Sequence, residues 1–210
     1  MRRLPIIIVL VGLMAASVAA AATPTPDAHD RALAQRLAAK VVALQKVASV
    51  SKGSDDKITN ALKDCKGLAK TPGESFAVVF AMLPVLLIDV VNQIRPLLLD
   101  VRATIGAMHP HAVLFRRWLA AERASIDLIL AFDNHGKKID YCTAAKVMLA
   151  KNTTDAQVLA VLGMPLSRIK ALFSGTSSQA SATLTKLNPQ TRAFLLAAGV
   201  RRSVAVQLTK

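Results

Sequence analysis

Acidic and aromatic residues are both scarce in this sequence. The 210 residues include 13 Asp and Glu against 27 Lys and Arg, with a single Trp and a single Tyr. Alanine and leucine fill the periodic segments instead, and both residues favour helix. No run alternates apolar and polar residues between turn signals, so we expect little or no strand.

The sequence also lacks the short motifs that mark common enzyme sites. It has no glycine-rich phosphate loop, no Cys-x-x-Cys or zinc-ligand spacing, and no Ser/His/Asp arrangement that indicates a nucleophile with its base. We therefore expect no cofactor, and a non-enzymatic protein is favoured over an enzyme.

Long apolar runs are missing from the body of the chain. The run from Phe76 to Ile88 is too short for a bilayer core, which needs about 20 residues. Asp89, Asn92 and Arg95 follow at once, and a charge at membrane depth costs about 3 kcal/mol. This segment is predicted to lie in a protein core and not in a membrane.

The first 22 residues are typical of a signal peptide. Arg2 and Arg3 form a basic start, residues 4–14 are apolar, and small residues end the segment at Ala22. We expect cleavage after Ala22 and a secreted or periplasmic protein of the cell envelope. No cysteine lies near the cleavage point, which excludes a lipoprotein anchor; the alternative is an uncleaved N-terminal anchor.

A strong positive charge remains after this cleavage. The formal charge of +14 falls by two, because the signal peptide contains two arginines and no acid. Outside the cytoplasmic membrane the abundant anionic partners are lipid headgroups, phosphate-bearing polymers and nucleic acid. Specific nucleic-acid recognition is not expected from an exported chain, and the sequence does not specify an oligomeric state.

The chain is organised around a long hydrophobic helix between Thr71 and Met108. A capping-box pattern, Thr71-Pro72-Gly73-Glu74, opens it. Its apolar stripe recurs at steps of three and four residues. The stripe consists of Phe76, Phe80, Leu83, Leu87, Val90, Ile94, Leu97, Val101, Ile105 and Met108. Pro84 and Pro96 predict a kink at each position or a split into two helices.

The other periodic segments predict an all-α bundle of five to seven helices around this one. Shorter helices are expected at 27–48, 56–69, 112–132, 139–149, 155–162, 167–173 and 189–198, with a flexible loop at 174–178. Asn188-Pro189 predicts the start of the last clear helix. The tail after Gly199 is expected to form a further short helix or a frayed end. We expect residues 23–152 to form the main bundle and residues 153–210 a subdomain of short helices packed on it.

Two glycines lie in segments that resemble each other. Residues 158–167 and 194–203 share a helix–glycine–helix layout around Gly163 and Gly199. The layout is loosely similar to a helix-turn-helix DNA reader. The predicted signal peptide argues against that role, and two packed helical hairpins are the preferred interpretation.

Cys65 and Cys142 are the only cysteines, and both lie on apolar stripes of predicted helices. Both survive the predicted cleavage, and an exported protein meets an oxidising environment. We expect a structural disulfide between them; the alternative is two buried free thiols.

The four histidines do not predict a metal site. His109 and His111 precede one helix, whereas His135 and Asp133 follow it. The span between the two groups is about 36 Å at 1.5 Å per helical residue, so they cannot share one ion. A His-x-His pair alone supplies too few ligands.

Glu122 is the one acid predicted on an apolar stripe, beside Trp118 and Ile126. We expect a structural ion pair with Arg95 or Arg102 of the preceding helix. The alternative is a buried acid with a raised pKa in an enzyme whose site is assembled from scattered residues.

These observations favour an exported, basic helical protein that binds an anionic or amphiphilic, lipid-like component of the cell envelope. Its expected contacts with an anionic surface are Arg201, Arg202, Lys137 and Lys138. The alternative hypotheses are an enzyme with a scattered site that includes Glu122, and a purely structural or partner-binding helical module.

Overall fold

The computed structural model describes residues 24–44, 82–164 and 176–210, together with six single positions between 53 and 68. Within these parts the chain forms seven helices and no strand, which confirms the predicted all-α class. The predicted signal peptide, most of the helix at 56–69, the start of the central helix and the helix at 167–173 lie outside the described residues.

The first helix, α1, spans Ala28–Leu44 and begins where the sequence predicts. Asp27 caps it, because its Oδ1 accepts a hydrogen bond of 2.8 Å from the backbone N–H of Asp30. Leu33, Leu37 and Val41 then face the core, as their spacing predicts.

The central helix, α4, spans Leu83–Gly106. Pro84 lies in its first turn, where no backbone donor is needed. The helix continues through Pro96, so of the two predicted alternatives, a kink or a split, the split does not occur there. The predicted stripe is also wrong at its first two described positions: Leu83 and Leu87 are exposed, at 38% and 39%. Val85 and Ile88 are buried instead. Residues 83–88 are apolar on every side of the helix, so periodicity alone does not select the buried face there.

Helices α5 (Val113–Leu130) and α9 (Thr176–Ala197) form the largest helix pair of the fold and run antiparallel. Phe115 of α5 contacts Phe194 of α9 with ring centroids 5.2 Å apart. Trp118 is fully buried and donates from Nε1 to Asn188 Oδ1 over 2.9 Å. Burial of a side chain of this size contributes about 3 kcal/mol.

The sequence prediction for α9 is wrong in two places. Its first residues, 176–178, belong to the expected loop 174–178, and Asn188 and Pro189 lie inside the helix instead of starting it. The side chain of Asn188 accepts from Trp118 and donates to the backbone of Lys210, so it does not cap a helix. Tertiary partners have overridden a local cap signal.

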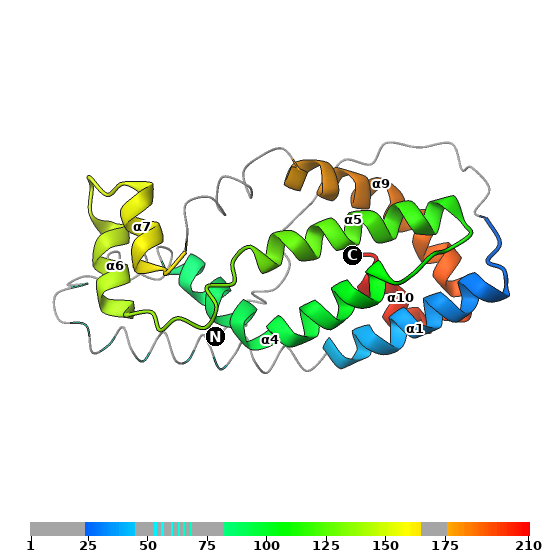
Figure 1. Cartoon of the computed structure of the whole chain (residues 1–210), viewed down its shortest axis with the longest axis horizontal. Coiled ribbons are helices and arrows are strands. Elements are labelled where there is room, and N and C mark those ends of the chain that lie inside the picture. The colour runs from blue at the N-terminus through cyan, green and yellow to red at the C-terminus, as the bar shows by residue number, and fades with distance from the viewer. Residues whose placement is uncertain are drawn as a thin grey trace, which may run out of the picture.

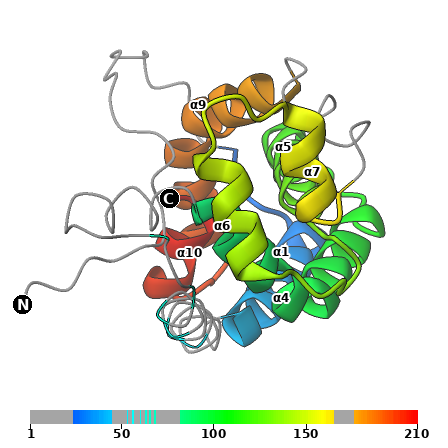
Figure 2. The same ribbon diagram turned by 90° about the vertical axis from the view of Figure 1, so that its left-hand side faces the viewer.

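The last helix, α10 (Arg202–Leu208), closes the bundle. In order around the core, α9 packs on α5, α5 on α4, α4 on α1, α1 on α10, and α10 on α9. Figure 2 shows these five helices arranged in a ring when the molecule is viewed along its long axis. The main core lies inside the ring and includes Leu37, Val101, Phe115, Phe194 and Val204, one from each helix.

A second, smaller core lies at the other end of the molecule. Helices α6 (Tyr141–Leu149) and α7 (Asp155–Val161) pack on each other and on the first half of α4 (Figure 1). Val85 and Ile88 belong to this core, whereas Leu98 and Val101 belong to the main one. The cores therefore group α9 and α10 with the main bundle. The predicted domain boundary at residue 152 remains a prediction.

A buried polar side chain connects the two cores. Asn134, which is 1% exposed, accepts from Asn92 of α4 over 2.8 Å and donates to the carbonyls of Lys137 and Leu162. The adjacent Asp133 accepts from Arg95 Nε over 2.6 Å. Because a buried amide needs its partners, this contact fixes the α5–α6 loop against α4 and the end of α7.

The predicted disulfide is present between Cys65 and Cys142, with Cα atoms 5.4 Å apart and a sequence separation of 77. It joins the segment before α4 to the first turn of α6. Among the described helices, none is long and apolar enough to cross a membrane.

Candidate functional site

One end of the bundle is assembled around the carboxylate of Asp30. This side chain is 2% exposed and accepts hydrogen bonds of 2.9 Å from the backbone N–H groups of His111 and Ala112. These amides directly precede α5, which has no side-chain cap of its own. A negative charge is favourable at the start of a helix. Asp30 therefore holds the beginning of α1 against the beginning of α5.

This contact brings three of the four histidines together. His111 Nδ1 lies 2.7 Å from Asp27 Oδ2, and the His29 ring stacks on the His111 ring with centroids 4.6 Å apart. His29 Nε2 lies 3.2 Å from the carbonyl oxygen of His109. The sequence groups only His109 with His111, because no local pattern connects α1 with a loop about 80 residues later.

The contact with Asp27 shifts the titration of both partners. The hydrogen bond and charge of Asp27 raise the pKa of His111, which the nearby Arg116 opposes. The amide of Asp30, and then His111, lower the pKa of Asp27. Both groups are exposed, so the ion pair contributes specific geometry more than stability.

The histidine rings are not arranged as metal ligands. The His29 and His111 planes lie 23° from parallel, so their ring nitrogens do not converge on one point. In the described ranges, no three His, Cys, Asp or Glu side chains are placed to hold a metal ion. His135 lies elsewhere, with its Nδ1 3.4 Å from Asp133 Oδ2.

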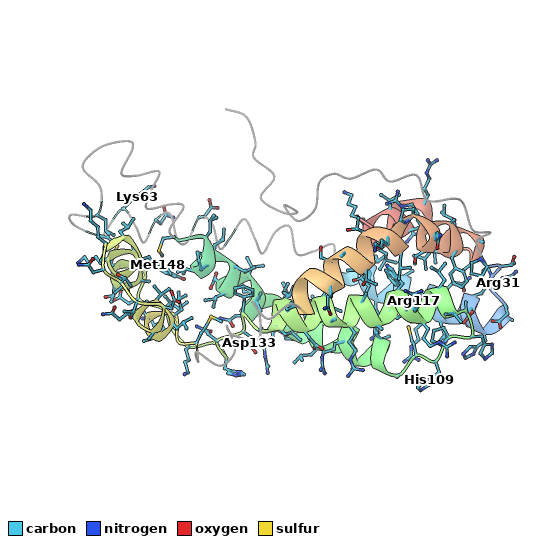
Figure 3. All side chains as sticks on the ribbon, turned by 90° about the horizontal axis from the view of Figure 1, so that it is seen from above. Arg31, Lys63, His109, Arg117, Asp133 and Met148 are labelled. Carbon is cyan, nitrogen blue, oxygen red and sulfur yellow. A yellow bond between two sulfur atoms is a disulfide. The ribbon has the colours of Figure 1, made fainter. Side chains whose placement is uncertain are left out.

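Five arginines belong to the same end of the bundle as the histidines. Arg31 belongs to the first turn of α1, and Arg116 and Arg117 to the first turns of α5. Figure 3 shows Arg31, Arg117 and His109 at one end of the molecule and Met148 at the other.

Arg201 and Arg202 join them through the α9–α10 turn. Gln35 of α1 donates to the carbonyl of Ala198 over 3.2 Å, which places this turn beside α1. We define the basic tip as the group Arg31, Arg116, Arg117, Arg201, Arg202, His29, His109 and His111; all eight side chains are exposed.

The charges of the basic tip are not neutralised by ion pairs, whereas three ion pairs lie along the sides of the bundle. On the sides, Lys40 pairs with Asp100, Arg95 with Asp133, and Arg102 with Asp127. The five arginines of the tip form no ion pair with any described residue. The two acids nearby, Asp27 and Asp30, are already hydrogen-bonded to His111 and to backbone amides.

Lys137 and Lys138, the other two predicted contacts, lie apart from the tip. Both are exposed in the α5–α6 loop, where the aliphatic part of the Lys137 side chain lies near Gly163, just after α7. The structure therefore separates the four predicted contacts into two places, and only Arg201 and Arg202 belong to a larger basic group.

Glu122 is partly buried and lacks the predicted partner. Arg95 and Arg102 pair with Asp133 and Asp127, so the expected ion pair with Glu122 is wrong. Burial raises its pKa from 4.5 to about 7. Glu122 forms no hydrogen bond or ion pair with another described residue, so nothing here assigns it a role in a site.

No protein-family model matches the chain, and no curated protein or solved structure is significantly similar to it.

Proposed function

We propose that this protein is an exported, non-enzymatic helical protein that binds an anionic, lipid-like component of the cell envelope through its basic tip. The observation that carries the proposal is the local excess of charge. Five exposed arginines lie around one end of the bundle, with no acidic partner among the described residues.

The arrangement of the arginines fits a role in surface contact better than it fits a role in solubility alone. Charges that serve solubility are usually mixed in sign and dispersed, as along the sides of this bundle. The arginines of the tip come from α1, α5 and α10, which the folded chain brings to one end. A planar guanidinium group also matches the oxygens of a phosphate through two hydrogen bonds.

Export supports the choice of partner. The predicted signal peptide directs the chain to a compartment where lipid headgroups and phosphate-bearing polymers are the main anions. A basic group close to an anionic membrane contributes about 1 kcal/mol, and the attraction decreases within a Debye length of about 10 Å.

Vesicle cosedimentation tests the proposal. The full-length mature protein should bind phosphatidylcholine vesicles that contain phosphatidylglycerol, and should not bind vesicles of phosphatidylcholine alone. Arg201→Gln combined with Arg202→Gln should weaken binding about tenfold, since two groups contribute about 1 kcal/mol each at most and 1.4 kcal/mol is a factor of ten.

The matched control is Lys137→Gln combined with Lys138→Gln, which removes the same charge from the other end of the molecule. It should change the affinity by less than about threefold, because charges beyond a Debye length are screened. Equal retention on both kinds of vesicle, retention on neither, or equal effects of the two double variants would refute the proposal.

A further inference from the structure

Three histidines of the basic tip lie among the arginines that the proposed function assigns to surface binding. His29 and His111 are in ring contact, and His29 Nε2 lies 3.2 Å from the backbone of His109. Histidine is the side chain whose unperturbed charge changes near neutral pH. The tip thus contains five arginines that are always positively charged and three histidines, a residue type whose charge depends on pH.

Charged groups near the histidines influence their protonation. Asp27, which caps α1, and Asp30 in its first turn act on His111, as does Arg116 of α5. Arg31 belongs to the same first turn of α1, and Arg201 and Arg202 lie beyond the α9–α10 turn. Asp27 favours one proton, on His111, through the contact of 2.7 Å. The His29 ring stacks on the His111 ring, so the two imidazoles lie side by side at the tip.

An anionic surface favours the charged form of the histidines at the tip. Its potential, about −30 mV or more negative, attracts protons as well as basic side chains. Protonation and binding at the tip must then favour each other, because a ligand that binds the protonated form more tightly also raises proton affinity.

We propose that the His29–His109–His111 cluster makes the basic tip a pH-dependent contact for anionic phospholipid bilayers, which takes up protons as it binds. This inference rests on the proposed function and adds its regulation. It predicts that binding strengthens in mildly acidic surroundings, although the phosphodiester headgroup stays ionised.

The test compares vesicle binding at about pH 7.5 and about pH 5.5 with phosphatidylcholine–phosphatidylglycerol vesicles. Each added charge near the surface corresponds to about fivefold in affinity, so the full-length mature protein should bind at least fivefold more tightly at the lower pH. The triple variant His29→Gln, His109→Gln, His111→Gln should show less than a twofold difference. Glutamine keeps an N–H donor at each position but does not titrate.

His135→Asn is the matched control, since it removes the histidine outside the tip. Its backbone φ is 59°, a conformation that asparagine tolerates. This variant should keep the full pH dependence.

A calorimetric measurement does not depend on any variant. Binding at about pH 6.5, measured in buffers of different ionisation enthalpy, should show uptake of about one proton or more per protein.

The possible outcomes separate the two proposals. Binding that depends on Arg201 and Arg202 but is independent of pH would leave the proposed function intact and overturn this inference. A pH dependence that survives in the triple variant, or binding without proton uptake, would also overturn it. Absence of binding at both pH values would refute both proposals.

Discussion

A buried carboxylate, Asp30, and a partly buried one, Glu122, are accommodated in opposite ways. Asp30 receives hydrogen bonds from two backbone amides and fixes the junction between α1 and α5. Glu122 has no such partner among the described residues, and burial raises its pKa to about 7. The sequence indicated that Glu122 is buried. It did not indicate the role of Asp30, because the amides that it binds lie about 80 residues away.

Glu122→Gln should make the stability of the protein less dependent on pH. The folded-state pKa of about 7 lies above the ordinary 4.5, so the folded protein binds the proton more tightly than the unfolded chain. The stability that Glu122 contributes is therefore complete below about pH 4.5 and is lost as the pH rises through 7. The glutamine variant avoids this loss.

Urea unfolding of both proteins at pH 5 and pH 8 measures the effect. At pH 5 their free energies of unfolding should be similar. At pH 8 the variant should be more stable by up to about 3 kcal/mol, since each pKa unit corresponds to about 1.4 kcal/mol. Parallel behaviour of the two proteins at both pH values would show that Glu122 is solvated in the folded state.

At the scale of helices, the resemblance between residues 158–167 and 194–203 reflects a shared C-cap. Gly163 and Gly199 have φ angles of 69° and 83°. In both segments the next residue, Met164 or Val200, donates its N–H five residues back and is buried. This Schellman arrangement ends α7 and α9 and turns the chain, which accounts for the repeated glycine without a DNA-binding role.

Gly199→Ala should destabilise the protein by about 1–2 kcal/mol, because an L-residue resists positive φ. The new Cβ would also lie 3.3 Å from Gln35 Nε2. Gly106→Ala is the matched control: this glycine is helical, and its Cβ would meet only ordinary contacts at 3.6 Å.

The control should leave the protein unchanged or up to about 1 kcal/mol more stable, since alanine favours helix. Thermal unfolding of both variants distinguishes the two effects. If the two substitutions proved equally harmful, the strained backbone at Gly199 would not be the cause.

The sequence predicts helices well where capping and periodicity agree, and poorly where tertiary contacts compete with them. Thr154 forms the capping box of α7 with Gln157, close to the predicted start. Asn188-Pro189 is an equally clear N-cap signal. However, the side chain of Asn188 accepts a hydrogen bond from Trp118, and the helix continues through Pro189. The basic tip depends wholly on tertiary contacts, so sequence analysis identified Arg201 and Arg202 but not their association with His29.

For the whole molecule, the disulfide connects a segment before α4 with the lobe formed by α6 and α7. Closing a loop of 77 residues contributes about 4.5 kcal/mol in the chain-entropy model. Replacing both Cys65 and Cys142 by alanine should therefore lower the free energy of unfolding by about 2–5 kcal/mol.

Thiol labelling of the denatured, unreduced wild-type protein provides the check on the bond itself. No thiol should react before a reductant is added. Complete labelling without reductant, or a double variant as stable as the wild type, would contradict a stabilising disulfide.

The pairing of α5 with α9 has a consequence for how the chain reaches its native state. α9 follows α6 and α7 in the sequence, so Trp118 cannot enter its site against Asn188 until a late part of the polypeptide is available. Contacts this distant along the chain are slow to form. A nascent chain emerging from the ribosome would thus remain without its main core for most of its synthesis. The proposed export would need such an unfolded chain in order to pass through a narrow translocation pore.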